Sequence, residues 1–110
     1  MIDLDAATRR EVESIVGRFL PASEVRLVGS RARAGAKRNA DIDLLVIRSK
    51  PLSPRERALV NTAFEESSVP FKVDVLEWAC LTPSFRERLT EGGAPVLCGP
   101  GKETSDSVRP

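Results

Sequence analysis

The sequence predicts a small α/β (α+β) domain, in which a mixed sheet of three to four strands is flanked by helices. Short β-branched or alternating runs are interspersed with segments that carry apolar residues at helical spacing. Most of the helical segments also begin with a capping signal. With 110 residues, of which 41% are hydrophobic, the chain can bury one small core. Strand and helix signals that alternate in this way indicate a sheet covered by helices.

The first half of the chain contains one expected helix, followed by two expected strands. The helix begins near Asp5 or Thr8, because the four residues Thr-Arg-Arg-Glu from Thr8 onward match a capping box and apolar residues then recur at helical spacing. Residues 24–28 alternate like a strand and lead into a Gly-Ser pair. Residues 41–47 follow a basic stretch and form a β-branched apolar run, which is typical of a central buried strand.

The second half contains two more expected helices and two more strands. Ser53 is an expected N-cap, because proline follows at the first helical position and glutamate at the third. Residues 70–78 have the composition of a third strand. Thr82-Pro83 opens the last helix, and residues 95–98 are expected to form a short edge strand.

The chain is expected to form one domain, over residues 1–98. Residues 99–110 consist almost entirely of glycine, serine, proline and charged residues, which predicts a disordered tail. No apolar run approaches the roughly 20 residues that cross a membrane, and the N-terminus does not match a signal peptide. The sequence therefore predicts a cytoplasmic protein that does not bind a membrane.

The residue types that are absent from the chain limit the catalytic mechanisms that it can use. The chain has neither histidine nor tyrosine. Mechanisms that use a Ser-His-Asp or Cys-His arrangement are therefore excluded, as is any metal site with histidine ligands. Catalysis would depend on carboxylates, lysine, arginine, hydroxyls or a metal held by oxygen. The net charge of +1 indicates no general affinity for nucleic acid.

Two aspartates stand at the start of the expected central strand. Residues two apart on a strand point to the same face, so the carboxylates of Asp41 and Asp43 should project together. Two unpaired carboxylates would repel each other, and a shared divalent cation such as Mg²⁺ or Mn²⁺ would relieve that repulsion. The alternative is a solvated strand end with no function.

A third aspartate, Asp74, lies within the next expected strand and is flanked by apolar residues. An unpartnered carboxylate is costly in such surroundings. If its strand lies beside the strand of Asp41, the three carboxylates can hold two metal ions, or one metal ion plus a general base. The alternative is an edge strand on which Asp74 faces water and pairs with Lys72 or an arginine.

The Gly29-Ser30 pair is a candidate phosphate site. Glycine lets the backbone approach a ligand closely, and a short helix starting near Arg31 would offer free N–H groups and the Ser30 hydroxyl to a phosphate. Arg31, beside this turn, is a further candidate nucleotide-binding residue. Four basic residues crowd the segment that follows, and they either neutralise a triphosphate or form a solvated loop: Arg31, Arg33, Lys37 and Arg38. No P-loop and no dinucleotide-binding glycine motif is present.

These features together resemble the signature of the polymerase-beta-like nucleotidyltransferase superfamily. That signature is a Gly-Ser turn, a spacer, an Asp-x-Asp within a strand, and a third carboxylate on a later strand. Gly29-Ser30, a ten-residue gap, Asp41-Ile42-Asp43 and Asp74 match it. The run from Gly29 to Val46 is especially similar to the small stand-alone members, the minimal nucleotidyltransferases (MNT). The resemblance covers about residues 4–98.

The resemblance implies a role for each matching residue. Asp41 and Asp43 would bind two Mg²⁺ ions that bridge a nucleoside triphosphate, and Asp74 would complete the site and help to activate the attacking hydroxyl. Gly29 and Ser30 would hold the β- and γ-phosphates. The implied reaction is in-line attack on the α-phosphate, with release of pyrophosphate. The resemblance implies no role for Arg31 or Arg33, because the basic spacer varies in such proteins. The roles of Lys37 and Arg38 are open as well.

The small size of the chain implies a partner. Larger members of the superfamily add a helical domain, and minimal members commonly pair with an all-helical HEPN toxin. The resemblance therefore implies an adenylyltransferase antitoxin that transfers AMP from ATP to a tyrosine of that toxin. A homo- or hetero-oligomer is expected, because an isolated half-site must either bind weakly or be completed by another chain.

Two other functions remain open at this point. One is a nucleotidyltransferase that acts on a small molecule, for which a homodimer could supply the second wall of the site. The other is a non-catalytic module that neutralises a partner by covering it. Direct binding of nucleic acid is not expected, because aromatic residues make up only 5% of the chain and no aromatic platform accompanies the basic segment.

Overall fold

The computed structural model describes residues 4–32, 40–91 and 93–98 of the chain. Four strands form one sheet, with the order β3-β2-β1-β4. The strands are β1 (Glu24–Val28), β2 (Ile42–Ile47), β3 (Val73–Glu77) and β4 (Val96–Cys98). The pair β2–β3 is parallel, whereas β1 pairs antiparallel with both β2 and β4. The predicted mixed sheet is therefore confirmed.

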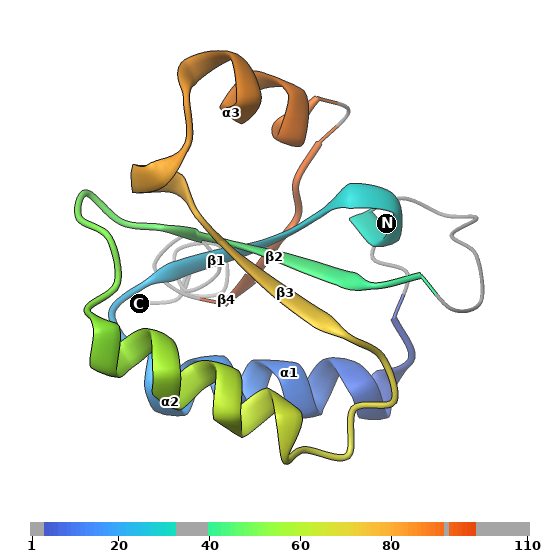
Figure 1. The fold of residues 1–110 in the computed structure, drawn as a ribbon. Coiled ribbons are helices and arrows are strands. Elements are labelled where there is room, and N and C mark those ends of the chain that lie inside the picture. Colours follow the sequence, from blue (N-terminus) through green and yellow to red (C-terminus); the bar gives the residue numbers. More distant parts are fainter. Residues whose placement is uncertain (1–3, 33–39, 92, 99–110) are drawn as a thin grey trace, which may run out of the picture.

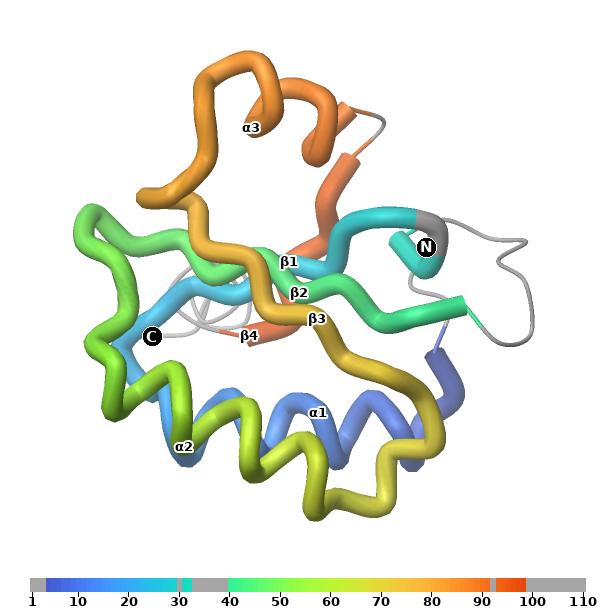
Figure 2. Tube along the Cα trace, viewed as in Figure 1, coloured from blue at the N-terminus to red at the C-terminus, as the bar shows by residue number. Residues whose placement is uncertain are grey.

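Helices lie on both sides of the sheet (Figure 1). They are α1 (Ala6–Phe19), α2 (Pro54–Glu65) and α3 (Pro83–Thr90), and two short 3₁₀ helices, η1 (Gly29–Ala32) and η2 (Trp78–Cys80), follow β1 and β3. Figure 2 shows α1 and α2 side by side along one face, with α3 on the other side. None of the described α3 side chains is buried. No helix in the described part of the chain is long and apolar enough to cross a membrane.

The hydrophobic core lies between the sheet and the pair α1–α2. It takes its strand residues from alternate positions, which project from one face of the sheet. They are Val25, Leu27, Ile42, Leu44, Val46 and Leu97. The intervening residues, including Asp43, therefore project from the opposite face. The strand period thus places these six apolar residues against α1 and α2. Asp43 lies on the far side, where Val28 and Leu45 are also buried.

The helix starts follow local capping. Asp5 is the N-cap of α1 and accepts a hydrogen bond from the Thr8 backbone N–H at 2.7 Å. The expected capping box beginning at Thr8 is wrong, because Thr8 lies in the first turn and is buried. At α2 the predicted box is confirmed: the Ser53 hydroxyl accepts from the Glu56 N–H at 3.0 Å, and the Glu56 carboxylate accepts from the Ser53 N–H at 2.9 Å. Thr82 caps α3 as predicted.

The strands are slightly shorter than expected from composition. The ladder between β2 and β3 begins at Ile42 and Val73, so Asp41 stands just before β2 and residues 70–72 precede β3. A strand ends where its neighbour offers no further backbone partner, and composition alone does not show that point. The expected tail, residues 99–110, and the segment 33–39 with Arg33, Lys37 and Arg38 lie outside the described residues.

Candidate functional site

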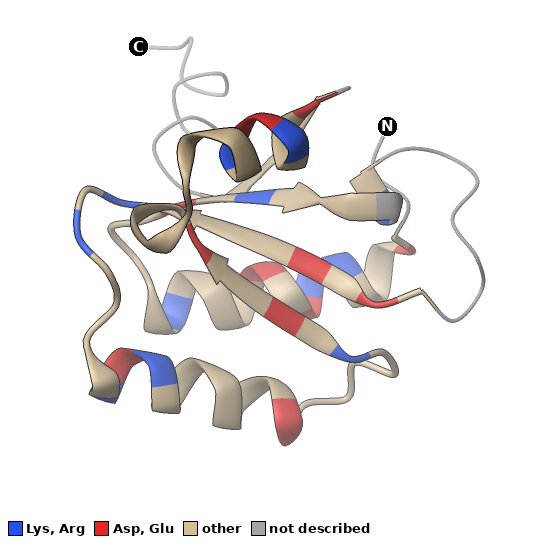
Figure 3. Ribbon diagram, turned by 45° about the horizontal axis from the view of Figure 1, so that its top comes forward, with Lys and Arg blue, Asp and Glu red and all other residues tan. Residues whose placement is uncertain are grey.

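The strand register brings two of the predicted aspartates together. Asp43 on β2 and Asp74 on β3 are direct partners in the parallel ladder. Figure 3 shows the acidic segments of these two strands side by side. Asp41 lies two residues before Asp43 and is exposed. Carboxylates from two segments about thirty residues apart in the sequence thus come from the same end of two adjacent strands.

Asp74 combines features of both interpretations given above. Its strand does lie beside the strand of Asp43, as the metal-site hypothesis required. The same strand is also the edge of the sheet, and the Asp74 side chain is 41% exposed. The Lys72 ammonium lies 3.7 Å from the Asp74 carboxylate. Alternation along the chain already placed Lys72 and Asp74 on one face, so the sequence carried the signal for this pair.

The carboxyl group of Asp43 has a raised pKa. Burial raises its pKa above the ordinary value, and the negative charges of Asp74 and Asp41 raise that pKa further. The positive charge of Lys72 lowers it only in part. The ionised form of Asp43 is therefore under-compensated, which is the electrostatic condition that a bound cation would relieve.

The donor chemistry of these residues fits a hard divalent cation, since oxygen ligands suit Mg²⁺ and Mn²⁺. Within residues 4–32, 40–91 and 93–98, however, no three aspartate, glutamate or cysteine side chains are grouped closely enough to hold one metal ion. Asp43 and Asp74 are the pair that the register brings together. Metal binding by Asp41, Asp43 and Asp74 therefore stays a prediction.

Gly29 forms the wall of the site beside Asp43. Its φ of 78° lies in the left-handed region, which glycine adopts without steric cost. A Cβ atom added at Gly29 would lie 2.5 Å from Oδ2 of Asp43. The turn begins η1 at Gly29 rather than near Arg31, where a short helix was expected. The Ser30 backbone lies in η1, while its side chain lies outside the described part of the structure.

Arg31 is buried, with only 6% of its surface exposed. Its Nε donates a hydrogen bond to the carbonyl oxygen of Ala40 at 2.8 Å, and its guanidinium stacks on Phe71 at 4.1 Å from the ring centre. Binding of a nucleotide by Arg31 stays a prediction, and these contacts are with the protein itself. The role of Phe71 has no signal in the sequence, because no local pattern links it to a residue forty positions earlier.

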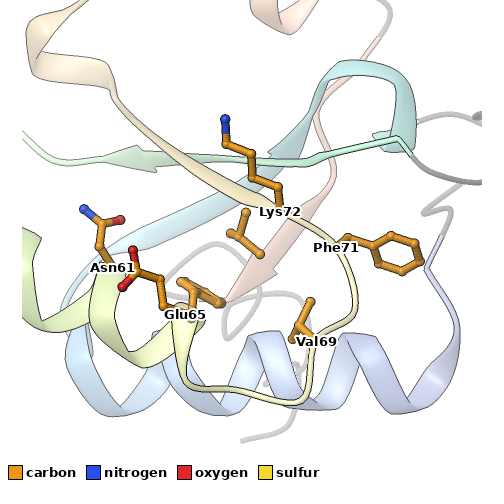
Figure 4. A pocket seen from close by; sticks show the side chains of 7 residues that line it. Asn61, Glu65, Val69, Phe71 and Lys72 are labelled. Atoms are coloured by element: carbon orange, nitrogen blue, oxygen red, sulfur yellow. The ribbon is translucent and has the colours of Figure 1, made fainter.

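A cleft opens beside the candidate site, between α2 and the start of β3 (Figure 4). Its volume is about 350 Å³. The lining residues are Asn61, Phe64, Glu65, Val69, Phe71, Lys72 and Val73. Two of them connect it to the site, because Lys72 pairs with Asp74 and Phe71 stacks on Arg31.

The raised pKa of Asp43 predicts how stability depends on pH. The ordinary pKa of this carboxyl is 3.8, and the folded protein raises it, so the folded protein holds the proton more tightly. The protonated Asp43 carboxyl therefore contributes to the free energy of unfolding. This contribution is fully present below pH 3.8 and is lost as the pH rises through the raised pKa. With a metal chelator present, we expect Asp43→Asn to be more stable than the wild type at about pH 7, with the difference shrinking toward pH 3.8.

Urea unfolding followed by circular dichroism at several pH values measures this difference. Glu87→Gln, at an exposed position on α3, is the matched control and should change stability little at any pH. An Asp43→Asn variant that is less stable than the wild type at neutral pH would show that burial of the charge and repulsion by Asp74 and Asp41 do not dominate at this position.

Known proteins match this chain in sequence. The profile of the family described as nucleotidyltransferase domain matches residues 9–95. A curated relative, the probable protein adenylyltransferase MntA of Haemophilus influenzae, is 35% identical over 86 residues. That match covers 78% of this chain and 75% of the relative.

Solved structures match the fold. A toxin–antitoxin structure with AMP-PNP superposes with a TM-score of 0.67 at 17% identity, over 88% of this chain and 77% of the matched chain. A complex of a tri-AMPylated HEPN toxin of Shewanella oneidensis with its MNT antitoxin gives a TM-score of 0.63 at 15% identity, over 90% and 76% of the two chains. At these identities, the likeness shows the fold alone.

Proposed function

The chain belongs to the nucleotidyltransferase domain family, as a minimal nucleotidyltransferase of the MntA type, and from this premise we propose that it transfers AMP from ATP to a hydroxyl group of a partner protein. The curated relative is named as a probable protein adenylyltransferase. The partner that best fits is a HEPN-type toxin, with this chain as its antitoxin, since a fold neighbour is an MNT antitoxin in complex with an AMPylated HEPN toxin. A cytoplasmic location belongs to the same proposal, because ATP is the donor.

The observation that carries the proposal is the pairing of Asp43 with Asp74 against the Gly29 turn. Two carboxylates on adjacent strands, with a left-handed glycine beside them, place acidic ligands next to a backbone that a phosphate can approach closely. A module that only covers its partner needs neither the paired acids nor the perturbed pKa of Asp43.

The proposed site assigns a role to each residue. Nucleotidyltransferases of this family generally use divalent metals, and two Mg²⁺ ions (or Mn²⁺) held by Asp41, Asp43 and Asp74 would supply positive charge to the triphosphate. The backbone at Gly29 and Ser30 orients the β- and γ-phosphates. Asp74, partly exposed on the edge strand, faces the side from which an acceptor hydroxyl can arrive and accepts its proton.

The acceptor oxygen then bonds to the α-phosphorus as the bond to the bridging oxygen breaks, and pyrophosphate leaves. This chemistry is positioning plus charge stabilisation, so a chain without histidine can perform it. We take residues 1–98 as the catalytic domain, because the family match spans residues 9–95 and β4 completes the sheet at Cys98.

Transfer of label tests the proposal. Purified protein is incubated with Mg²⁺, α-labelled ATP and either the co-expressed neighbouring gene product or host lysate. We expect label on one small partner protein with the wild type and with Glu87→Gln, and none with an Asp41→Asn/Asp43→Asn double variant. Label on a small molecule instead of a protein would show that the acceptor is a small molecule and would contradict the proposed protein acceptor. If the wild type still binds its partner but transfers no label from any nucleoside triphosphate, the chain is a non-catalytic binding module.

A further inference from the structure

We propose that Arg31 is a positioning residue, which holds the Gly29-Ser30 turn against the starts of the two strands that carry the carboxylates. It acts through protein contacts and not as a ligand of the nucleotide. This inference rests on the proposed function for its effect on the rate, but its structural part can be tested without any activity.

The burial of Arg31 is the first support. A guanidinium that is 94% inside the protein loses its hydration, and such a loss is tolerated only where the protein supplies partners. Ala40 supplies a carbonyl oxygen at 2.8 Å from Nε, and Phe71 supplies a ring face at 4.1 Å from the guanidinium carbon. Ala40 and Phe71 are themselves only half-buried, but the guanidinium that they contact is withdrawn from water, so these contacts are worth more than similar contacts on the surface.

The positions of the partners are the second support. Ala40 directly precedes Asp41, and Phe71 directly precedes Lys72, which pairs with Asp74. Arg31 itself lies in η1, two residues after Gly29. The Arg31 side chain therefore connects the Gly29-Ser30 turn to the two segments that lead into β2 and β3.

The site needs a contact that holds the strand starts together, because its carboxylates repel one another. Asp43 and Asp74 are direct partners in the parallel ladder, so two carboxylates of like charge face each other where β2 and β3 begin. The ladder holds the strands only from Ile42 onward, where the Ile42 N–H donates to the Lys72 carbonyl at 2.9 Å. Arg31 contacts the residues that lie outside the ladder at this end.

The effect of Arg31 is geometric. Both of its described contacts, the hydrogen bond from Nε to Ala40 and the stack on Phe71, depend on the shape of the guanidinium as well as on its charge. A lysine keeps that charge, but it has neither the planar face that stacks on Phe71 nor the Nε position that reaches Ala40. Arg31→Lys and Arg31→Gln should therefore have similar consequences, although only one of them removes the charge.

Steady-state kinetics with labelled ATP separate the two roles. If Arg31 positions the site, both substitutions lower kcat by about 10- to 100-fold and change KM for ATP by less than about threefold. Phe71→Leu, which removes the stack, should reproduce this pattern, and the Arg31→Lys/Phe71→Leu double variant should be less impaired than the product of the single effects. Arg55→Lys, on the exposed face of α2, is the matched control and should leave both constants unchanged.

The opposite result would identify a phosphate ligand. In that case Arg31→Gln raises KM for ATP by about tenfold or more, and Arg31→Lys restores most of the loss, because a phosphate accepts either cation. That pattern would overturn the inference.

Hydrogen exchange tests the structural part separately. Arg31→Lys and Phe71→Leu should each speed amide exchange at residues 41–44 and 72–75 and leave α2 protected. Unchanged exchange in both segments would overturn the inference. If the wild type proves inactive, the proposed function fails, while the exchange result still decides whether Arg31 holds the strand starts. If Arg31→Lys does not fold, Phe71→Leu carries both measurements.

Discussion

An Asp43→Asn variant is expected to lose AMP transfer by about 10³-fold while remaining folded. Asparagine has the shape of aspartate but lacks the charge that a divalent cation requires. Asp43 stands at the centre of the site, as the ladder partner of Asp74 and the neighbour of the Gly29 backbone. The loss should appear in kcat more than in KM for ATP, because the charge is needed most as the leaving group departs.

Initial rates of label transfer at saturating ATP measure this effect, and circular dichroism confirms the fold. Glu87→Gln also removes one carboxylate charge, from an exposed position on α3, and should retain full activity. An Asp43→Asn variant that keeps more than about a tenth of the wild-type rate would remove Asp43 from the catalytic role.

A Gly29→Ala variant is expected to be impaired in both stability and activity. Alanine in the left-handed region costs about 1–2 kcal/mol, which should appear as a lower free energy of unfolding. Its Cβ would also lie 2.5 Å from Oδ2 of Asp43, so the carboxylate or the turn has to move. A shift of about 1 Å at a catalytic group is enough for a loss of about 100-fold in transfer rate.

Gly17→Ala is the matched control. Gly17 lies in α1 with no atom within 4 Å of an added Cβ, so alanine should raise stability by about 0.5–1 kcal/mol and leave transfer unchanged. Urea unfolding and label transfer are measured on both variants. Equal behaviour of Gly29→Ala and Gly17→Ala would mean that the close approach between Gly29 and Asp43 is not required.

Most of the elements could be predicted from the sequence because their signals are local. The capping box at Ser53, the N-cap at Thr82 and the β-branched run after Asp41 each lie within a few residues. The start of α1 shows the limit of such signals. Asp5 and Thr8 both have capping side chains, and the structure uses Asp5 and buries Thr8. That choice depends on packing, which a local pattern does not contain.

For the candidate site as well, some features could be predicted from local sequence and others depended on tertiary structure. The period of a strand put Asp41 and Asp43 on one face, and Lys72 and Asp74 on one face, from sequence alone. Whether these two pairs lie close together depends on whether their strands are neighbours in the sheet. The sequence alone did not determine the strand order. The structure shows that Asp43 and Asp74 are partners on neighbouring parallel strands, and it also makes β3 an edge strand, so that Asp74 is both a neighbour of Asp43 and partly exposed.

The sequence by itself thus determined the fold class, which segments form strands and which form helices, and the family that the acidic motif resembles. Only the tertiary structure decided the register of Asp43 against Asp74, the contact between the Gly29 turn and Asp43, and the burial of Arg31 against Ala40 and Phe71. The physical reason is the range of the interactions. Caps and periodicity act within one or two turns of chain, whereas register and burial depend on how residues thirty or forty positions apart pack around one core.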